Sequence, residues 1–453
     1  MKILIAGVGK SGDRLTRQLS AEGHEIILID KNAGRLEEAV EQYDVMAVCG
    51  DCTLMNILLQ ADVREADLLI VTTSADEVNL LCCMTAHYLN PDIHTIVRIC
   101  NPDYSEQIYE MRKTFALSLA VNPELQAAEE IDRLLKYPGF LKREVFARSR
   151  VEIVELRVNE QSPLCNVSLN ELPNIVRCHI LVCTVLRDGE AMTPDGSFVL
   201  KAGDYIFVTG IPQELTKLLK NLGVITRRIK RVMLCGGGKV SYYLARRLEK
   251  SGISVKIIEK DHDRCVKLSE SLEKAEIVEG DASHQPLLES EGISSYDSLI
   301  TMMGIDEFNM IVSLYGKSVG IPQVITKVGH IDNGSILSSL SLDSIISPKE
   351  ICAASIVRYV RAMQNTQGAA LTVHPIAGGQ AEALEFMVDS KTKHCGEPLK
   401  DIVTRSDVLI ACITHGKETL IPSGNSSFVP GDIVIIVTHS GHDIRSLNDI
   451  FEK

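Results

Sequence analysis

The residues of this chain with the clearest chemical potential are the glycines of AGVGKSGDRL, residues 6–15. The triplet that begins at Gly9 resembles the end of a P-loop, which cradles a triphosphate and magnesium. Gly7, Gly9 and Gly12 also spell G-x-G-x-x-G, the pattern that holds the pyrophosphate of a dinucleotide. The two interpretations predict different ligands.

Spacing argues against the P-loop interpretation. A P-loop needs a further glycine upstream, where this chain has Leu4 inside an apolar run. A second stretch, CGGGKVS, keeps Gly236, Gly238 and Lys239 but has Val240 where a P-loop requires Ser or Thr. We therefore favour the dinucleotide pattern.

The neighbouring residues give this pattern a structural context. Gly7 permits a tight turn, Gly9 lets the backbone approach phosphate, and Gly12 allows close packing of the following helix, whose first N–H groups face the anion. Asp30 ends the next apolar run, where its carboxylate can accept hydrogen bonds from ribose hydroxyls. An acidic group there disfavours a 2′-phosphate. Arg98 ends a later run, at the edge where phosphates would sit, and a plain surface charge is the alternative interpretation.

The elements that must position these residues occur twice. KILIAGVGKSG returns as RVMLCGGGKVS, and IILIDKN returns as KIIEKDH, which pairs Gly7 with Gly236 and Asp30 with Glu259. DLLIVTTSADEVN returns as DSLITMMGIDEFN. Such self-similarity predicts two copies of one unit.

Each unit consists of two parts with different secondary-structure patterns. Apolar runs at 3–6, 26–29, 68–71 and 95–97 alternate with helical patterns, which predicts a Rossmann-like, doubly wound parallel sheet. The second part carries strand patterns and turn signals such as Pro194-Asp195-Gly196, which predict a small α+β module. The expected domains are 1–124, 140–224, 230–350 and 371–453.

Composition narrows the class of protein. The chain has 453 residues and a net charge of −13, which argues against binding of nucleic acid. The sequence shows no apolar run long enough to cross a bilayer and no secretion signal, so we expect a cytoplasmic protein. Its 13 cysteines are expected to be reduced thiols. For the stretch from Cys49 to Cys52 we favour a turn that places Asp51 beside the adenine, and a redox pair of the two cysteines is the alternative. The histidines show no metal-binding spacing.

Together these stretches resemble one family over the whole chain, the nucleotide-binding peripheral subunits of Trk-type potassium uptake systems, which carry tandem RCK domains. The match rests on KILIAGVGKSG, IILIDKN, GDCTLMNIL and TIVRICNPDY, and on their counterparts in the second copy. The resemblance implies a regulatory homotetrameric ring at the inner face of the membrane. By the same resemblance, we expect this ring to dock on a transmembrane potassium-translocating subunit of the TrkH or TrkG type and to respond to NAD(H) or to ATP and ADP.

The resemblance, together with the residue patterns, predicts the nucleotide contacts. In the first copy they are Gly7, Val8, Gly9, Lys10, Ser11, Gly12, Asp30, Asp51, Thr73, Ser74 and Arg98. In the second copy they are Gly236, Gly238, Lys239, Glu259 and Asp281. Ser241 replaces the third glycine there, and Met302-Met303 replace Thr72-Thr73, so the sequence leaves the occupancy of the second copy open.

An NAD-dependent oxidoreductase is the competing class of function. It would need an acid or base beside the nicotinamide, and the modules that follow the predicted sheets carry no catalytic pattern. We therefore predict no catalytic residue and no enzyme activity. A scaffold that binds no nucleotide is a third interpretation.

Overall fold

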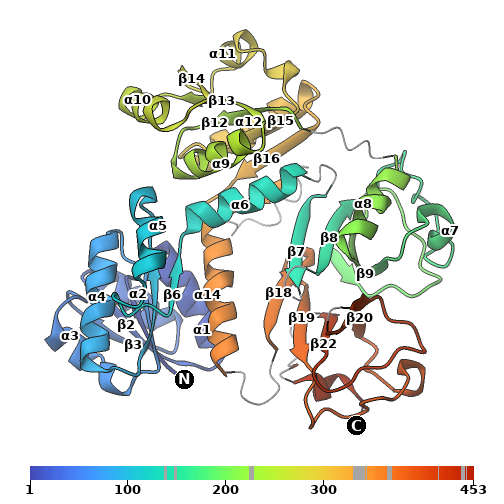
Figure 1. Ribbon diagram of the computed structural model, residues 1–453, viewed down its shortest axis with the longest axis horizontal. Coiled ribbons are helices and arrows are strands. Elements are labelled where there is room, and N and C mark those ends of the chain that lie inside the picture. Colours follow the sequence, from blue (N-terminus) through green and yellow to red (C-terminus); the bar gives the residue numbers. More distant parts are fainter. Residues whose placement is uncertain are drawn as a thin grey trace.

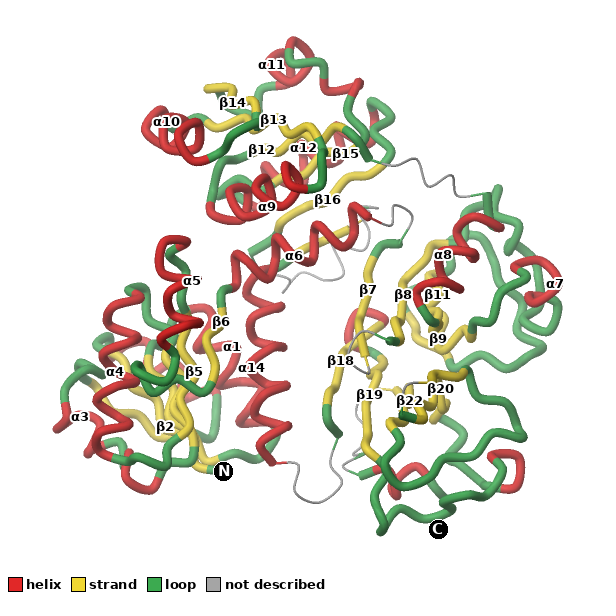
Figure 2. The backbone as a smooth tube through the Cα atoms, in the orientation of Figure 1, coloured by secondary structure: helices red, strands yellow, loops and turns green. Residues whose placement is uncertain are grey.

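The computed structural model describes residues 1–136, 140–146, 150–223, 229–329, 342, 344–364, 370–416, 418–439, 444 and 446–452. These residues form two six-stranded parallel sheets and two five-stranded antiparallel sheets (Figure 1). The parallel sheets carry helices on their faces, and the antiparallel sheets lie together on the other side of the molecule (Figure 2). This architecture confirms the predicted Rossmann-like domains with strand-rich modules.

The first parallel sheet has the strand order β3-β2-β1-β4-β5-β6. Its strands are short apolar runs, and all four residues of β4 are buried, as expected for a sheet covered on both faces. The elements are β1 (Lys2–Ala6), α1 (Lys10–Ala21), β2 (Glu25–Asp30), α2 (Ala33–Gln42), β3 (Met46–Cys49), α3 (Met55–Gln60), β4 (Leu68–Val71), α4 (Asp76–Leu89), β5 (His94–Arg98), α5 (Pro102–Met111) and β6 (Leu119–Val121).

The second parallel sheet repeats the first, with the order β14-β13-β12-β15-β16-β17. The repeat in sequence is thus a repeat in topology. The elements are β12 (Arg231–Cys235), α9 (Lys239–Lys250), β13 (Ser254–Glu259), α10 (His262–Ser271), β14 (Glu276–Glu279), α11 (Gln285–Ser290), β15 (Ser298–Thr301), α12 (Asp306–Ser318), β16 (Gln323–Lys327) and β17 (Ser344–Ile346).

The two antiparallel sheets are also copies of each other, because the order β10-β9-β11-β8-β7 matches β21-β20-β22-β19-β18 strand for strand. The first module contains β7 (Lys142–Phe146), β8 (Val151–Arg157), α7 (Leu172–Val176), β9 (Leu181–Arg187), β10 (Glu190–Met192), β11 (Tyr205–Gly210) and α8 (Pro212–Asn221). The second contains β18 (Thr372–Ile376), β19 (Ala381–Met387), β20 (Val408–His415), β21 (Glu418–Leu420) and β22 (Ile433–His439).

Two helices that follow the parallel sheets exchange partners. Helix α6 (Pro123–Lys136) follows the first sheet, yet its residue Ile131 belongs to the core of the second domain, together with Leu234 of β12. Helix α14 (Pro348–Gln364) follows the second sheet, yet its residue Ile356 packs in the core of the first domain with Leu15 of α1. Figure 1 shows α6 beside α9 and α14 beside α1. Each Rossmann domain is therefore completed by a helix from the other half of the chain.

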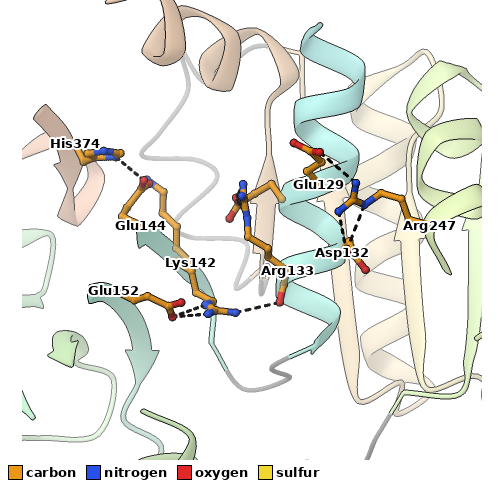
Figure 3. A network of polar contacts seen from close by, with 10 residues as sticks. Glu129, Asp132, Arg133, Lys142, Glu144, Glu152, Arg247 and His374 are labelled. Carbon is orange, nitrogen blue, oxygen red and sulfur yellow. Dashed lines mark hydrogen bonds and ion pairs between the residues drawn. The ribbon is translucent and has the colours of Figure 1, made fainter. Parts of the chain in front are cut away.

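Polar contacts accompany this exchange and join the helices to the modules (Figure 3). Arg247 of α9 reaches Glu129 and Asp132 of α6 at 3.2 and 3.4 Å. Between the modules, Nδ1 of His374 on β18 lies 2.6 Å from a carboxylate oxygen of Glu144 on β7. The sheets of the two modules also share one buried apolar cluster, so the modules pack face to face.

Candidate nucleotide-binding site

The glycine loop between β1 and α1 has the geometry that its sequence predicts. Gly7 has a φ of +93°, and a Cβ there would lie 2.9 Å from the backbone nitrogen of Thr73. A Cβ at Gly12 would overlap the carbonyl oxygen of Gly7. By contrast, a Cβ at Gly9 would meet nothing within 4 Å among the described residues. The loop therefore packs tightly on the sheet but faces open space at the start of α1, where backbone N–H groups point outward.

Asp30 is held across the end of this loop. One carboxylate oxygen accepts the N–H of Val8 at 2.7 Å, and the other accepts the N–H of Asn32 at 2.9 Å. Asn32 in turn accepts from the N–H of Arg35 and begins α2. A carboxylate has further lone pairs beyond these two bonds, so Asp30 is fixed in place with capacity left for ribose hydroxyls.

Asp51 lies at the end of β3 in a tight local turn. Its carboxylate accepts from the N–H and hydroxyl of Thr53 at 3.0 and 2.8 Å, and Lys31 lies 3.0 Å away. The Thr53 N–H and the Lys31 ammonium lower the pKa of Asp51 to about 2. Asp51 therefore shapes the turn, and a direct nucleotide contact from it remains a prediction.

The cysteines near this turn are not joined by a disulfide in the structure. All 13 cysteines of the chain are free thiols. Cys49 is exposed, whereas Cys52 is buried.

Asn79 of α4, which the sequence analysis did not single out, positions the other predicted contacts. Its amide oxygen accepts from the backbone N–H and the hydroxyl of Thr73 at 3.0 and 2.5 Å, and its amide nitrogen donates to the carbonyl of Arg98 at 2.9 Å. Asn309 makes the equivalent contacts with Met303 and Lys327. The presence of this asparagine at the same position of both copies was the sequence signal that could have indicated its positioning role.

A cavity of about 530 Å³ opens beside these residues, at the carboxyl ends of β4 and β5. Two of the predicted nucleotide contacts, Ser74 and Arg98, line this cavity. Two further lining residues come from outside this sheet, namely Glu124 at the start of α6 and Lys239 from the glycine loop of the second domain. The sequence analysis placed Lys239 with the second site, so its position at the first site is a new feature of the structure.

The second domain repeats the site with differences. Gly236 has a φ of +104°, and Gly238 precedes α9 as Gly9 precedes α1. Glu259 accepts the N–H groups of Gly237 and Asp261 at 2.6 and 2.9 Å. Asp281 accepts from the N–H and hydroxyl of Ser283, which lower its pKa, as Thr53 does for Asp51.

The two departures of the second copy compensate each other. In the first domain, the hydroxyl of Thr72 donates to the carbonyl of Gly7 at 3.0 Å. Met302 stands in place of Thr72 and has no hydroxyl, but the hydroxyl of Ser241 donates to the equivalent carbonyl of Gly236. The glycine loop is thus tied down in both domains, and Ser241 does not disrupt it.

Metal binding and membrane insertion are two further properties on which the described residues bear. Among the described residues, histidine, cysteine, aspartate and glutamate side chains do not gather into groups of three or more that could hold a metal ion. Within the same residues, no helix is both long enough and apolar enough to cross a membrane.

Family models match most of the two Rossmann domains and one module. The model for the TrkA-N domain matches residues 3–119 and again 232–348, and the model for the TrkA-C domain matches residues 153–223. The second module lies outside these matches but has the same strand order as the first.

Several relatives are similar in sequence to this chain over nearly its whole length. A Trk system potassium uptake protein TrkA homolog from Methanosarcina mazei is 30% identical over 96% of this chain and 97% of its own length. A homolog from Archaeoglobus fulgidus is 30% identical, with all of both chains covered. The TrkA protein of Vibrio alginolyticus is 28% identical over 100% of this chain and 99% of its own.

Solved structures share the fold. The GsuK channel bound to NAD superposes with a TM-score of 0.62 at 18% identity, covering 97% of this chain and 77% of that one. The GsuK RCK domain gives a TM-score of 0.62 at 17% identity, covering 97% and 92% of the two chains.

Proposed function

The chain belongs to the TrkA family of Trk potassium uptake proteins, and from this premise we propose that it is a regulatory subunit that binds NAD(H) or adenine nucleotides and gates a transmembrane potassium-translocating protein. The observation that carries the proposal is the composite cavity of the first domain. It is lined by cations of both Rossmann domains, Arg98 and Lys239, and lies at the same carboxyl edge of the first sheet as the glycine loop and the fixed carboxylate of Asp30.

In this proposal the ligand lies along the carboxyl edge of the first sheet. Asp30 binds the ribose, the backbone from Gly7 to Ser11 faces the pyrophosphate, and Arg98 with Lys239 binds its charge. The solved GsuK channel is described as bound to NAD, and a further GsuK structure as bound to ADP, which supports this ligand class here.

The cavity also suggests how binding becomes regulation. Arg98 belongs to the first domain and Lys239 to the second, so an anionic ligand between them would stabilise one relative placement of the domains. A ligand shifts an equilibrium only if it binds one arrangement better than another. A site built from two domains meets that condition.

We further propose a homo-oligomeric, tetrameric ring on the cytoplasmic face of the membrane, docked on a TrkH-like or TrkG-like subunit. Exposed apolar side chains on two equivalent helices support self-association. Leu81, Met84 and Tyr88 of α4 are 52%, 41% and 74% exposed, and Phe308 and Ile311 of α12 are 42% and 61% exposed. Their helical spacing places them on one face of each helix.

An oxidoreductase is the alternative, and the comparisons give it no support, because each full-length relative described above is named as a potassium uptake protein. The test uses the full chain and the variant Asp30→Ala. We expect the wild-type chain to bind NADH, ADP or ATP in calorimetry without oxidising NADH, and Asp30→Ala to lose first-site binding and nucleotide-dependent potassium flux while it keeps its oligomeric state. Unchanged affinity at the first site in Asp30→Ala, or turnover of NADH by the purified chain, would refute the proposal.

A further inference from the structure

Apolar side chains are exposed at the outer edge of the first Rossmann domain, where β3 is the last strand of the described sheet and α3 packs beside it (Figure 1). Four of them, each between 39% and 51% exposed, are Met46, Leu54, Met55 and Leu59. Met46 lies on the α3 side of β3, because Val48, two residues along the strand, packs with Leu58 in the core beneath α3. We call these four side chains the first-domain edge.

The first-domain edge is also free of charge along α3. From Thr53 to Ala61 the sequence contains no Asp, Glu, Lys or Arg. Single exposed apolar side chains are ordinary on a protein surface, but a group of them on adjoining elements marks a contact surface.

The second Rossmann domain provides an internal comparison. Counted from the equivalent residues Asp51 and Asp281, the four matching positions are all exposed and polar, namely Glu276, His284, Gln285 and Glu289. These groups have polar partners, as on a solvated surface. The carboxylate of Glu276 lies 3.1 Å from the ammonium of Lys256, and Glu289 accepts from the amide of Gln285 at 2.8 Å. The same fold therefore accepts polar residues at all four positions, so folding does not require the apolar ones.

The edge strands of the two sheets differ in the same way. Strand β3 reads MAVC, whereas β14 reads EIVE and carries a carboxylate at each end. One of these, Glu279, lies 2.8 Å from Nδ1 of His262. Charged side chains protect an exposed edge strand from pairing with another chain. The second sheet has this protection and the first does not, which indicates that a partner covers the first-domain edge.

The charge beside the first-domain edge indicates what kind of partner this is. Helix α2 packs against β3, and the stretch 33–44 has four exposed carboxylates and one cation, Arg35. The carboxylates belong to Glu37, Glu38, Glu41 and Asp44. The matching stretch, 262–273, has three carboxylates, two cations and a histidine. An apolar surface next to an acidic helix complements a segment that is both apolar and basic.

Two other partners fit this surface less well. The inner leaflet of a membrane is anionic and attracts basic surfaces, not acidic ones. Facing copies of this chain would bring the carboxylates of α2 near each other. In addition, the apolar faces of α4 and α12 occur in both Rossmann domains, as suits contacts between identical chains, whereas the first-domain edge occurs in one. Cytoplasmic segments of membrane proteins, by contrast, carry an excess of Lys and Arg.

We propose that the first-domain edge docks on an apolar, Lys- and Arg-rich cytoplasmic segment of the transmembrane potassium-translocating subunit. This inference rests on the proposed function and assigns the docking to one of the two Rossmann domains. The apolar side chains of β3 and α3 supply the buried contact, and the carboxylates of α2 attract and orient the basic segment.

The test exchanges the first-domain edge for its counterpart in the full chain. The combined substitutions Met46→Glu, Leu54→His, Met55→Gln and Leu59→Glu introduce the residues that the second copy has on the same fold. Binding to the immobilised, detergent-solubilised TrkH-like subunit of the same organism is measured by biolayer interferometry. We expect the affinity to fall about a hundredfold or more, because four apolar contacts are lost. Nucleotide affinity at the first site and the sedimentation coefficient should stay those of the wild type.

Matched variants separate the apolar and the charged contributions. Val266→Glu, at an exposed apolar residue of α10, is the control for the exchange and should leave docking unchanged. Glu41→Gln with Asp44→Asn should lower the affinity about tenfold at low salt and weaken its dependence on ionic strength. The equivalent pair in the second domain, Glu270→Gln with Glu273→Gln, should do neither. If the fourfold variant does not fold, Met55→Gln with Leu59→Glu replaces it and should still weaken docking.

The outcomes separate this inference from the proposed function. If the wild-type chain binds the TrkH-like subunit and the folded edge variant binds it equally well, the inference fails while the proposed function stands. A lower sedimentation coefficient of the edge variant would assign this surface to contacts between copies and overturn the inference. Wild-type binding to vesicles with anionic lipid that the variant loses would assign it to the membrane and also overturn it. A wild-type chain that does not bind the subunit would overturn the proposed function itself.

Discussion

Lys239, from the glycine loop of the second Rossmann domain, lines the same cavity as Arg98, which ends β5 of the first. Two cations separated by more than a hundred residues of sequence are thus brought to one site. If the proposed function holds, the phosphate end of the first site belongs to both domains, and its affinity for nucleotide depends on how the domains are placed.

Substitution of Lys239 should weaken binding at the first site selectively for ligands with a pyrophosphate. We expect Lys239→Ala to reduce the affinity for ADP or NADH by about tenfold, because one charge-assisted contact is lost. Adenosine, which has the ribose but no phosphate, should bind equally to variant and wild type. Calorimetry on both ligands checks this, with Lys267→Ala as the control. An equal loss for adenosine would show that the variant disturbs the fold of the site.

Substitution at the third position of the glycine pattern should cost more stability in the first domain than in the second. Gly12→Ala places a Cβ against the carbonyl of Gly7 and should destabilise the first domain by a few kcal/mol. Ser241→Ala removes only the donor to Gly236 and should cost about 1 kcal/mol. Urea denaturation of the two variants gives the comparison. A larger loss in Ser241→Ala than in Gly12→Ala would contradict the described packing.

The exchanged helices predict that a core substitution acts at a distance in sequence. Ile131→Ala on α6 should destabilise the second domain by about 2 to 4 kcal/mol and speed amide exchange in β12 and α9. Ile356→Ala on α14 should do the same to β1 and α1 of the first domain. Hydrogen exchange read by peptide distinguishes the two patterns. Faster exchange confined to the sheet that precedes each helix would contradict the exchange.

The contact between the modules should weaken in acid. Burial raises the pKa of Glu144, but Lys142 and His374 outweigh it and lower the value to about 2, below the ordinary glutamate value of about 4.3. A carboxyl group whose pKa is lowered by folding stabilises the fold at pH values above its ordinary pKa. This stabilisation is lost as the pH falls toward the pKa of the folded state. The stability difference between wild type and Glu144→Gln should therefore shrink between about pH 5 and about pH 2. Urea denaturation over this range measures it, with the exposed Glu418→Gln as control. A difference independent of pH would argue against the ion pair.

The apolar faces of α4 and α12 should be required for assembly. Leu81→Asp combined with Ile311→Asp is expected to lower the sedimentation coefficient to that of a monomer, because charge in a buried contact is costly. Both side chains are exposed within one chain, so the fold should be retained in circular dichroism. Val403→Asp, at an exposed apolar residue of the second module, should leave assembly intact. A double variant that still assembles would place the interface elsewhere.

The sequence was sufficient to predict the fold class and the glycine loop, because both depend on local patterns. The strand at 3–6, the turn at Gly7 and the carboxylate of Asp30 lie within one strand-turn-helix-strand unit, and the structure places them as that pattern requires. The binding roles of the predicted contacts stay predictions.

The exchange of helices was not predictable in the same way. The sequence indicates a helix start at Asn122-Pro123, and Asn122 does cap α6 by accepting the N–H of Leu125. An apolar helix face, however, does not specify which of two similar sheets it covers. The placement of Lys239 at the first site depends on that choice, so it too required the structure.

The reciprocal packing of α6 and α14 has a consequence for biosynthesis. The amino-terminal sheet can be made early, but the residue that fills its core, Ile356, is translated only after the whole second sheet. The apolar surface of this sheet that α14 covers therefore stays exposed while more than two hundred further residues are translated. The two halves of the chain therefore mature together, and a nascent chain stalled before α14 would leave the α1 side of the first domain's core uncovered.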